Sequence, residues 1–284
     1  MFDEIRYELD GVKINRNRNI EITSSLKNYV TMSSDRIMIA SNADWDPWNS
    51  PNGYFNFCVP LNMLLRFCKD YRRVVINARH ELIVSRCCVL WKAGDTSAWL
   101  FTRGILYEFP LLQRTTKHLW AIKAATQLEK PRYVVFALQA DRKNVMLEDT
   151  SRFDHCKLTN VKLYLNSECY PYDDMNLDFD KNRWSIIYDT YVRFCKNYYG
   201  YDYLEPNQTV ANFWQKDPFV IIDCSRQNKS IKSATVDMRI EFECKENVPA
   251  STTAYCLIIH DRVVQYNPLT NVVRKITLVA MALF

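Results

Sequence analysis

Short strand-like runs recur about every ten residues along most of this chain, and they constrain its fold more than any other feature. The runs are apolar or alternate between apolar and polar residues, and Asn, Asp, Pro or Ser bounds them. This spacing is typical of antiparallel sandwiches and barrels, in which short turns join successive strands. The clearest example is residues 5–16, where Asp10-Gly11 separates two alternating runs and predicts a two-residue hairpin turn. The sequence therefore predicts an all-β fold.

Two segments have the period of a helix instead of a strand. Residues 181–199 repeat apolar side chains at three- and four-residue steps and end before Gly200, which predicts an amphipathic helix with a glycine stop. Residues 61–71 follow Pro60, and proline suits the start of a helix. Each predicted helix has strands before and after it, as it would if each of two β modules contained one inserted helix.

A turn-rich stretch at residues 91–114 is the predicted linker between the modules, because Gly94, Gly104 and Pro110 cluster there. We place the boundary near residue 112, which gives a first module of residues 1–112 and a second of residues 113–284. The second module holds an uninterrupted series of strand-like runs, and we expect it to form a sandwich of about eight strands.

Composition excludes several classes of protein. The chain has 284 residues, 48% hydrophobic and 24% charged, so disordered and collagen-like chains are excluded. A net charge of +5 is small for a dedicated nucleic-acid binder, and we expect no specific nucleic-acid partner. The N-terminus has acids where a signal peptide needs basic residues, and the apolar run at residues 276–284 is too short to span a bilayer. We expect an intracellular protein, in the cytoplasm or nucleus, that is neither secreted nor bound to a membrane.

The 10 cysteines and 4 histidines lack the C-x-x-C and H-x-x-H spacings of metal and redox sites. They predict reduced thiols, with Cys224, Cys244 and Cys256 facing the core, because apolar residues two positions away lie on the same strand face. Cys224 and His260 both end apolar runs beside an acid, but their spacing does not require a nucleophilic pair.

The acidic run at residues 173–180 has the alternating oxygens of a calcium loop, but Phe179 and Ser185 replace the glycine and the glutamate that such a loop needs. We interpret it as a loop that leads into the second helix, with Asp180 near the helix N-terminus. The 5 glycines are too far apart to cradle a phosphate, and no G-x-S-x-G elbow is present. We therefore expect no catalytic residue, no metal, no cofactor and no enzymatic activity.

Four aromatic side chains in loop-like segments form the candidate binding surface: Trp45, Trp48, Tyr201 and Tyr203. Such rings can stack on sugars or bases, although loops also use them to cover the ends of a sandwich.

Long ordered strings of this chain resemble one family. They include FDEIRYELDGVKINRNRN at the start, FNFCVPLNMLLRFC and YRRVVINARHELI in the first half, EKPRYVVFALQADRKN in the middle, and PFVIIDCSRQNKSIKSATVDMRIEFE near the end. The family is the double jelly roll-like domain family of invertebrate genomes, and the resemblance covers residues 2–276. That family is similar to the major capsid proteins of double-stranded DNA viruses and of Polinton-type mobile elements.

The resemblance implies a double jelly roll, that is, two antiparallel β-sandwiches side by side. It implies that the protein is a self-assembling shell component, or a degenerate endogenous relic of one. The implied partner is another copy of the same chain, and complete relatives are expected to form homotrimers. Residues 86–108 are shorter than the matching part of the family, which implies that the first jelly roll is incomplete. The alternative is a domesticated jelly-roll module that binds a host protein or a carbohydrate through Trp45, Trp48, Tyr201 and Tyr203.

Overall fold

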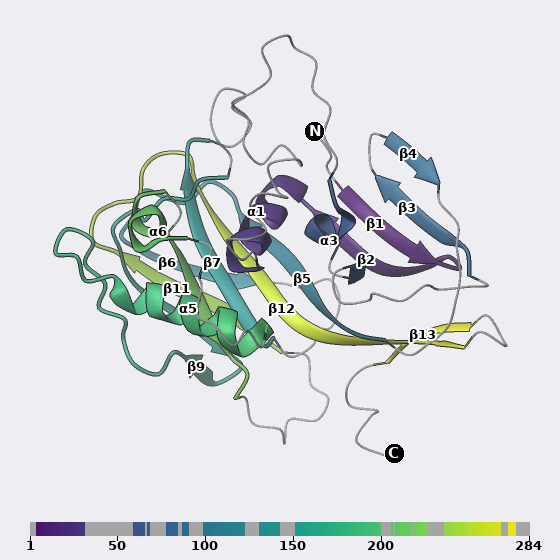
Figure 1. Cartoon of the computed structure of the whole chain (residues 1–284). Coiled ribbons are helices and arrows are strands. Elements are labelled where there is room, and N and C mark those ends of the chain that lie inside the picture. The colour runs from purple at the N-terminus through teal and green to yellow at the C-terminus, as the bar shows by residue number, and fades with distance from the viewer. Residues whose placement is uncertain are drawn as a thin grey trace, which may run out of the picture.

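The computed structural model describes residues 4–31, 59–65, 67–68, 78–84, 87–90, 99–122, 131–142, 151–199, 206, 208–216, 218–226, 236–267 and 272–276. In these residues three antiparallel sheets carry a few helices on their faces (Figure 1). The described helices are all too short or too polar to cross a membrane. The all-β class with inserted helices is therefore confirmed.

The N-terminal sheet has the strand order β2-β1-β3-β4. Its strands are β1 (Glu4–Leu9), β2 (Val12–Arg18), β3 (His80–Val84) and β4 (Cys87–Leu90). The predicted hairpin is present: Leu9 pairs with Val12, and Asp10 and Gly11 take left-handed φ values of 48° and 74°. Two such residues form the turn whose twist matches that of the strands it joins.

Two further sheets face each other. The inner sheet contains β10-β7-β12-β13 with β5 on the other edge of β12, and the outer sheet has the order β6-β11-β8-β9. Inner-sheet strands are β5 (Trp99–Phe109), β7 (Tyr133–Ala140), β10 (Phe219–Asp223), β12 (Thr252–Asn267) and β13 (Val272–Ile276). Outer-sheet strands are β6 (Lys117–Ile122), β8 (Leu158–Leu165), β9 (Glu168–Tyr170) and β11 (Met238–Cys244). From β6 to β8, and again from β10 to β12, the chain alternates between the sheets, as jelly rolls do.

The helices differ from the prediction in extent and in number. They are α1 (Ile20–Thr31), α3 (Leu61–Leu64), α5 (Ser185–Tyr199) and α6 (Val210–Lys216). The helix predicted at residues 181–199 is confirmed as α5. The one predicted at residues 61–71 is interrupted after α3, because Leu65 is extended (φ −115°, ψ 122°). Helices α1 and α6 were not predicted from the sequence.

The main hydrophobic cluster lies on both faces of the inner sheet. Phe136 of β7 meets Phe242 of the outer sheet, with ring centroids 5.0 Å apart, and Tyr133 on the opposite face meets Phe194 of α5 at 4.7 Å. Helices α1 and α5 therefore cover the face of the inner sheet that the outer sheet leaves open (Figure 1). A second cluster packs the N-terminal sheet, where the Tyr7 ring stacks on Phe67.

The stretch at residues 91–114, predicted to be a linker, contains strand β5. This strand pairs with β12 from Trp99, opposite Val264, to Phe109, opposite Ala254. Gly104 lies within the strand, opposite Ile259, although glycine weakens a strand interior. The linker interpretation is therefore wrong for residues 99–109. The boundary near residue 112 and the incomplete first jelly roll stay predictions.

Candidate functional site

The candidate binding surface lies outside the described residues. Trp45 and Trp48 belong to residues 32–58, and Tyr201 and Tyr203 belong to residues 200–205. Whether these four rings share one surface therefore stays a prediction.

Cys224 and His260 lie on opposite sides of Arg132, the residue just before β7. The Cys224 amide donates to the Arg132 carbonyl at 2.9 Å, and the Arg132 amide donates to the Ile259 carbonyl at 2.8 Å. Two strand spacings, about 10 Å, therefore separate the backbones of Cys224 and His260. Burial raises the pKa of the Cys224 thiol, which leaves it protonated and a poor nucleophile. The pair does not have the geometry of a nucleophile and its base.

The cysteines predicted to face the core are buried: Cys224 is 1% exposed, Cys244 5% and Cys256 0%. All seven cysteines whose side chains are described are free thiols, namely Cys68, Cys156, Cys169, Cys195, Cys224, Cys244 and Cys256. Burial raises the pKa of Cys68 and of Cys244 to about 11. The structure therefore confirms the prediction that Cys224, Cys244 and Cys256 face the core.

Lysines neutralise the acidic run at residues 173–180. Asp174 lies 2.7 Å from the Lys162 ammonium, and Lys245 lies 2.9 Å from Asp180 and 3.3 Å from Asp178. Hydrogen bonds from Lys162 and Lys245 lower the pKa of Asp174 and of Asp180. At Asp178 burial raises the pKa, but the hydrogen bond and charge of Lys245 and the nearby Lys181 lower it overall. Within the described chain no three metal-ligating side chains come together. We predicted Asp180 near the N-terminus of the second helix, but α5 begins at Ser185 and has no acidic residue in its first turn.

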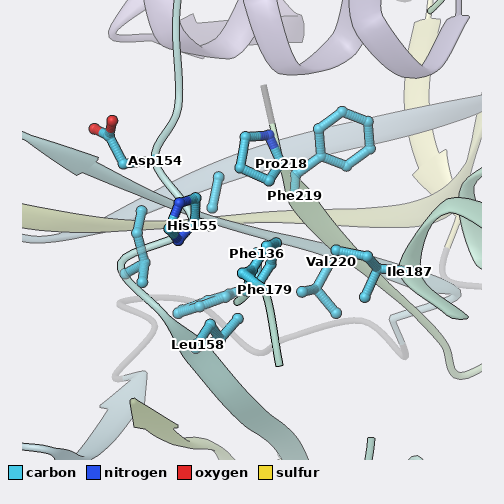
Figure 2. Close-up of a pocket in the computed structure, with 11 residues that line it drawn as sticks. Phe136, Asp154, His155, Leu158, Phe179, Ile187, Pro218, Phe219 and Val220 are labelled. Atoms are coloured by element: carbon cyan, nitrogen blue, oxygen red, sulfur yellow. The ribbon is translucent and has the colours of Figure 1, made fainter. Parts of the chain in front are cut away.

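A small pocket opens beside the start of β8 (Figure 2). The volume of the cavity is about 10 Å³, which is enough for about one water molecule. The His155 ring stacks on Phe179 with centroids 4.5 Å apart, and its Nδ1 accepts the Lys157 amide proton at 3.0 Å. Asp154 turns its carboxylate away from the lining and pairs with Arg142 at 2.7 Å (Figure 2). The pocket is thus a packing defect at the edge of the core, too small for an organic ligand.

The outer face of the outer sheet is an exposed surface whose charges are paired. The Arg239 guanidinium lies 4.6 Å from the Tyr164 ring centroid, and the Lys117 ammonium lies 2.7 Å from Glu243. Leu119 of β6 is an apolar exception, with 58% of the residue exposed. This surface can meet another protein through a strand edge and an exposed leucine. This surface was not predicted from the sequence, although the alternation in KHLWAI places the Leu119 side chain on the exposed face of β6.

The comparison with protein families gives one match. A model described as a double jelly roll-like domain matches residues 1–89 and 90–264 of this chain. No curated protein matches the sequence.

Three solved structures are similar to the chain at low sequence identity. The PBCV-1 VP54 structure fitted into a reconstruction of the virophage Sputnik has a TM-score of 0.48 and 9% identity, over 96% of this chain and 83% of that one. A quasi-atomic model of the PBCV-1 virus capsid has a TM-score of 0.45 and 8% identity, over 93% and 80%. The major capsid protein P2 of bacteriophage PM2 has a TM-score of 0.32 and 10% identity, over 91% and 81%.

Proposed function

This chain belongs to the double jelly roll-like domain family, and on that basis we propose that it is a capsid-like structural protein that associates with copies of itself. The observation that carries the proposal is the family match, which extends over residues 1–89 and 90–264. The resemblance of the sequence to this family implies a shell builder, whose function is carried out by surfaces between copies and not by a catalytic centre. We place this assembly inside the cell, since a chain of 10 cysteines without paired spacing favours reduced thiols.

The architecture supports this proposal in physical terms. The inner sheet is covered on both faces, by the outer sheet and by helices, so its large aromatic residues are used for packing within the chain. The outer sheet keeps one face open, and its charges pair within that face. A rigid sandwich with a solvated side face can meet neighbours repeatedly without changing its fold.

Light scattering of the purified chain over a range of concentrations tests the proposal. We expect the mass to rise above the 33.6 kDa of one chain as concentration increases, through weak or ill-defined oligomers. The family resemblance implies homotrimers in complete relatives, in which the first jelly roll is not shortened. A monomer at every concentration would contradict the proposal.

A further inference from the structure

In the described part of the chain, β6 is an edge strand of the outer sheet. Among the described strands it pairs only with β11, and its outward residues Lys117, Leu119 and Ala121 are all exposed. In β8, which has a neighbouring strand on each side, the side chains on the outer face of the sheet are only half-exposed. The opposite edge strand, β9, has 3 residues and is followed by Pro171, whereas α5 packs against the inner-sheet edge strand β10. Edge strands normally carry a feature that blocks pairing, and the short β9 and the covered β10 have one. Strand β6 has only one lysine, Lys117, at its first position, and its charge is paired with Glu243 at 2.7 Å.

The hydrogen bonds between β11 and β6 show which backbone groups of β6 point away from β11, toward the edge of the sheet. The Cys244 amide donates to the Thr116 carbonyl at 2.8 Å, and these two residues continue the β11–β6 register. In an antiparallel pair, residues that bond to the partner strand alternate with residues that point away from it. Even-numbered residues of β6 therefore bond to β11, and the amides and carbonyls of Lys117, Leu119 and Ala121 point to the edge. The Lys117 carbonyl already accepts a hydrogen bond from the Thr115 hydroxyl at 3.1 Å, and its second lone pair can accept another.

We propose that β6 pairs antiparallel with β6 of a second copy, around a two-fold axis that passes through Leu119. A register centred on Leu119 is the one that pairs Lys117, Leu119 and Ala121 of one copy with the same three residues of the other. It sets Leu119 opposite Leu119 of the partner subunit, and Lys117 opposite the partner's Ala121. No like charges face each other, and two exposed leucines cover each other's apolar surface.

The choice of a second copy as the occupant follows from this self-complementarity. A register centred on Lys117 would set two ammonium groups opposite each other and is disfavoured. The inference rests on the proposed function, because it names the surface by which one copy meets another. In a closed shell of three-fold units, an isologous two-fold contact of this kind can connect one unit to the next.

A cysteine placed on the axis tests the register in the full-length chain. Directly opposite residues of a bonded pair have Cα atoms about 5.5 Å apart, which a disulfide can bridge. Under mild oxidation, Leu119→Cys should yield a covalent dimer on a non-reducing gel. Ala121→Cys is the matched control, because its thiol is equally near the edge but faces the partner's Lys117. Equal dimer yields from the two variants would show unspecific contact and overturn the proposal.

A second variant measures affinity without a new bond. Leu119→Lys sets two like charges on the axis and should weaken dimerisation about tenfold or more in sedimentation experiments. Its thermal unfolding should match the unmodified chain, since the Leu119 side chain is largely in solvent. Unchanged dimerisation would overturn the proposal. If Leu119→Cys dimerises and a family member with a longer stretch at residues 86–108 stays monomeric, the shell function fails and the edge contact stands. If that relative forms trimers and Leu119→Cys does not dimerise, the shell function stands and the edge contact fails.

Discussion

At the scale of single residues, Tyr191 connects two helices that lie far apart in sequence. The residue is fully buried in α5, and its hydroxyl donates to the Tyr29 carbonyl in the last turn of α1 at 3.0 Å. Carbonyls in the last turn of a helix have no partner within the helix. Tyr191→Phe should therefore lower the free energy of unfolding by about 1–3 kcal/mol, measured by urea denaturation. Tyr172→Phe, at a residue that is 72% exposed, should leave it unchanged, and equal losses would contradict this role.

His155 makes stability depend on pH. Burial lowers the pKa of His155 and outweighs the nearby carboxylates of Asp154 and Asp180, which raise it. Protonation would also remove the Nδ1 lone pair that accepts the Lys157 amide. The unfolded chain titrates near pH 6.5 and takes up its proton first, so the free energy of unfolding should fall as pH drops below about 6.5. His155→Asn should flatten this dependence between pH 6.5 and 5, and urea titrations that show identical slopes would contradict the prediction.

At the scale of elements, the turn that opens β8 is strained. The Leu158 amide donates to the His155 carbonyl at 2.8 Å, and the central residues Cys156 and Lys157 have φ values of 41° and 49°. This turn type favours Asn-Gly. Lys157→Gly should raise the free energy of unfolding by about 1 kcal/mol, because relief of strain exceeds the loss of exposed ion pairs. Lys162→Gly, within strand β8, should lower it by about as much, and thermal unfolding of both variants checks the signs.

Local patterns account for the elements that the sequence predicts correctly. Alternation and a positive-φ dipeptide lie within a few residues of each other in the β1–β2 hairpin, so no distant contact is needed to recognise it. Helix α1 is different, because its β-branched residues disfavour a helix and only burial of Leu26 and Val30 against the main cluster makes one. The open edge of β6 is harder still. Its alternation is local, but its position in the sheet depends on strand order across 120 residues or so, which single-sequence patterns do not show.

At the scale of the whole molecule, two features join the N-terminal part of the chain to the rest. Leu26 of α1 is fully buried in the main cluster, and β13, paired to the end of the 16-residue strand β12, places Val273 against the N-terminal cluster. Leu26→Ala should lower the free energy of unfolding by about 2–5 kcal/mol.

Because the two clusters are linked, spectroscopic probes placed in each cluster should report unfolding at the same denaturant midpoint. Separate midpoints would contradict this coupling.

The number of chains that associate should depend on the extent of the first jelly roll. A stable interface between copies buries about 1,200–2,000 Å², and a three-fold tower takes that area from the sides of both jelly rolls. The family resemblance implies that this chain is shortened at residues 86–108, of which residues 99–108 lie in β5 of the inner sheet. We expect the shortening to reduce the area between copies, so this chain should associate weakly. A family member with a longer stretch there should form trimers. Light scattering of both proteins at matched concentrations measures the difference. A monomeric relative would contradict the shell builder and favour the binding module, whose candidate surface includes Trp45 and Tyr201.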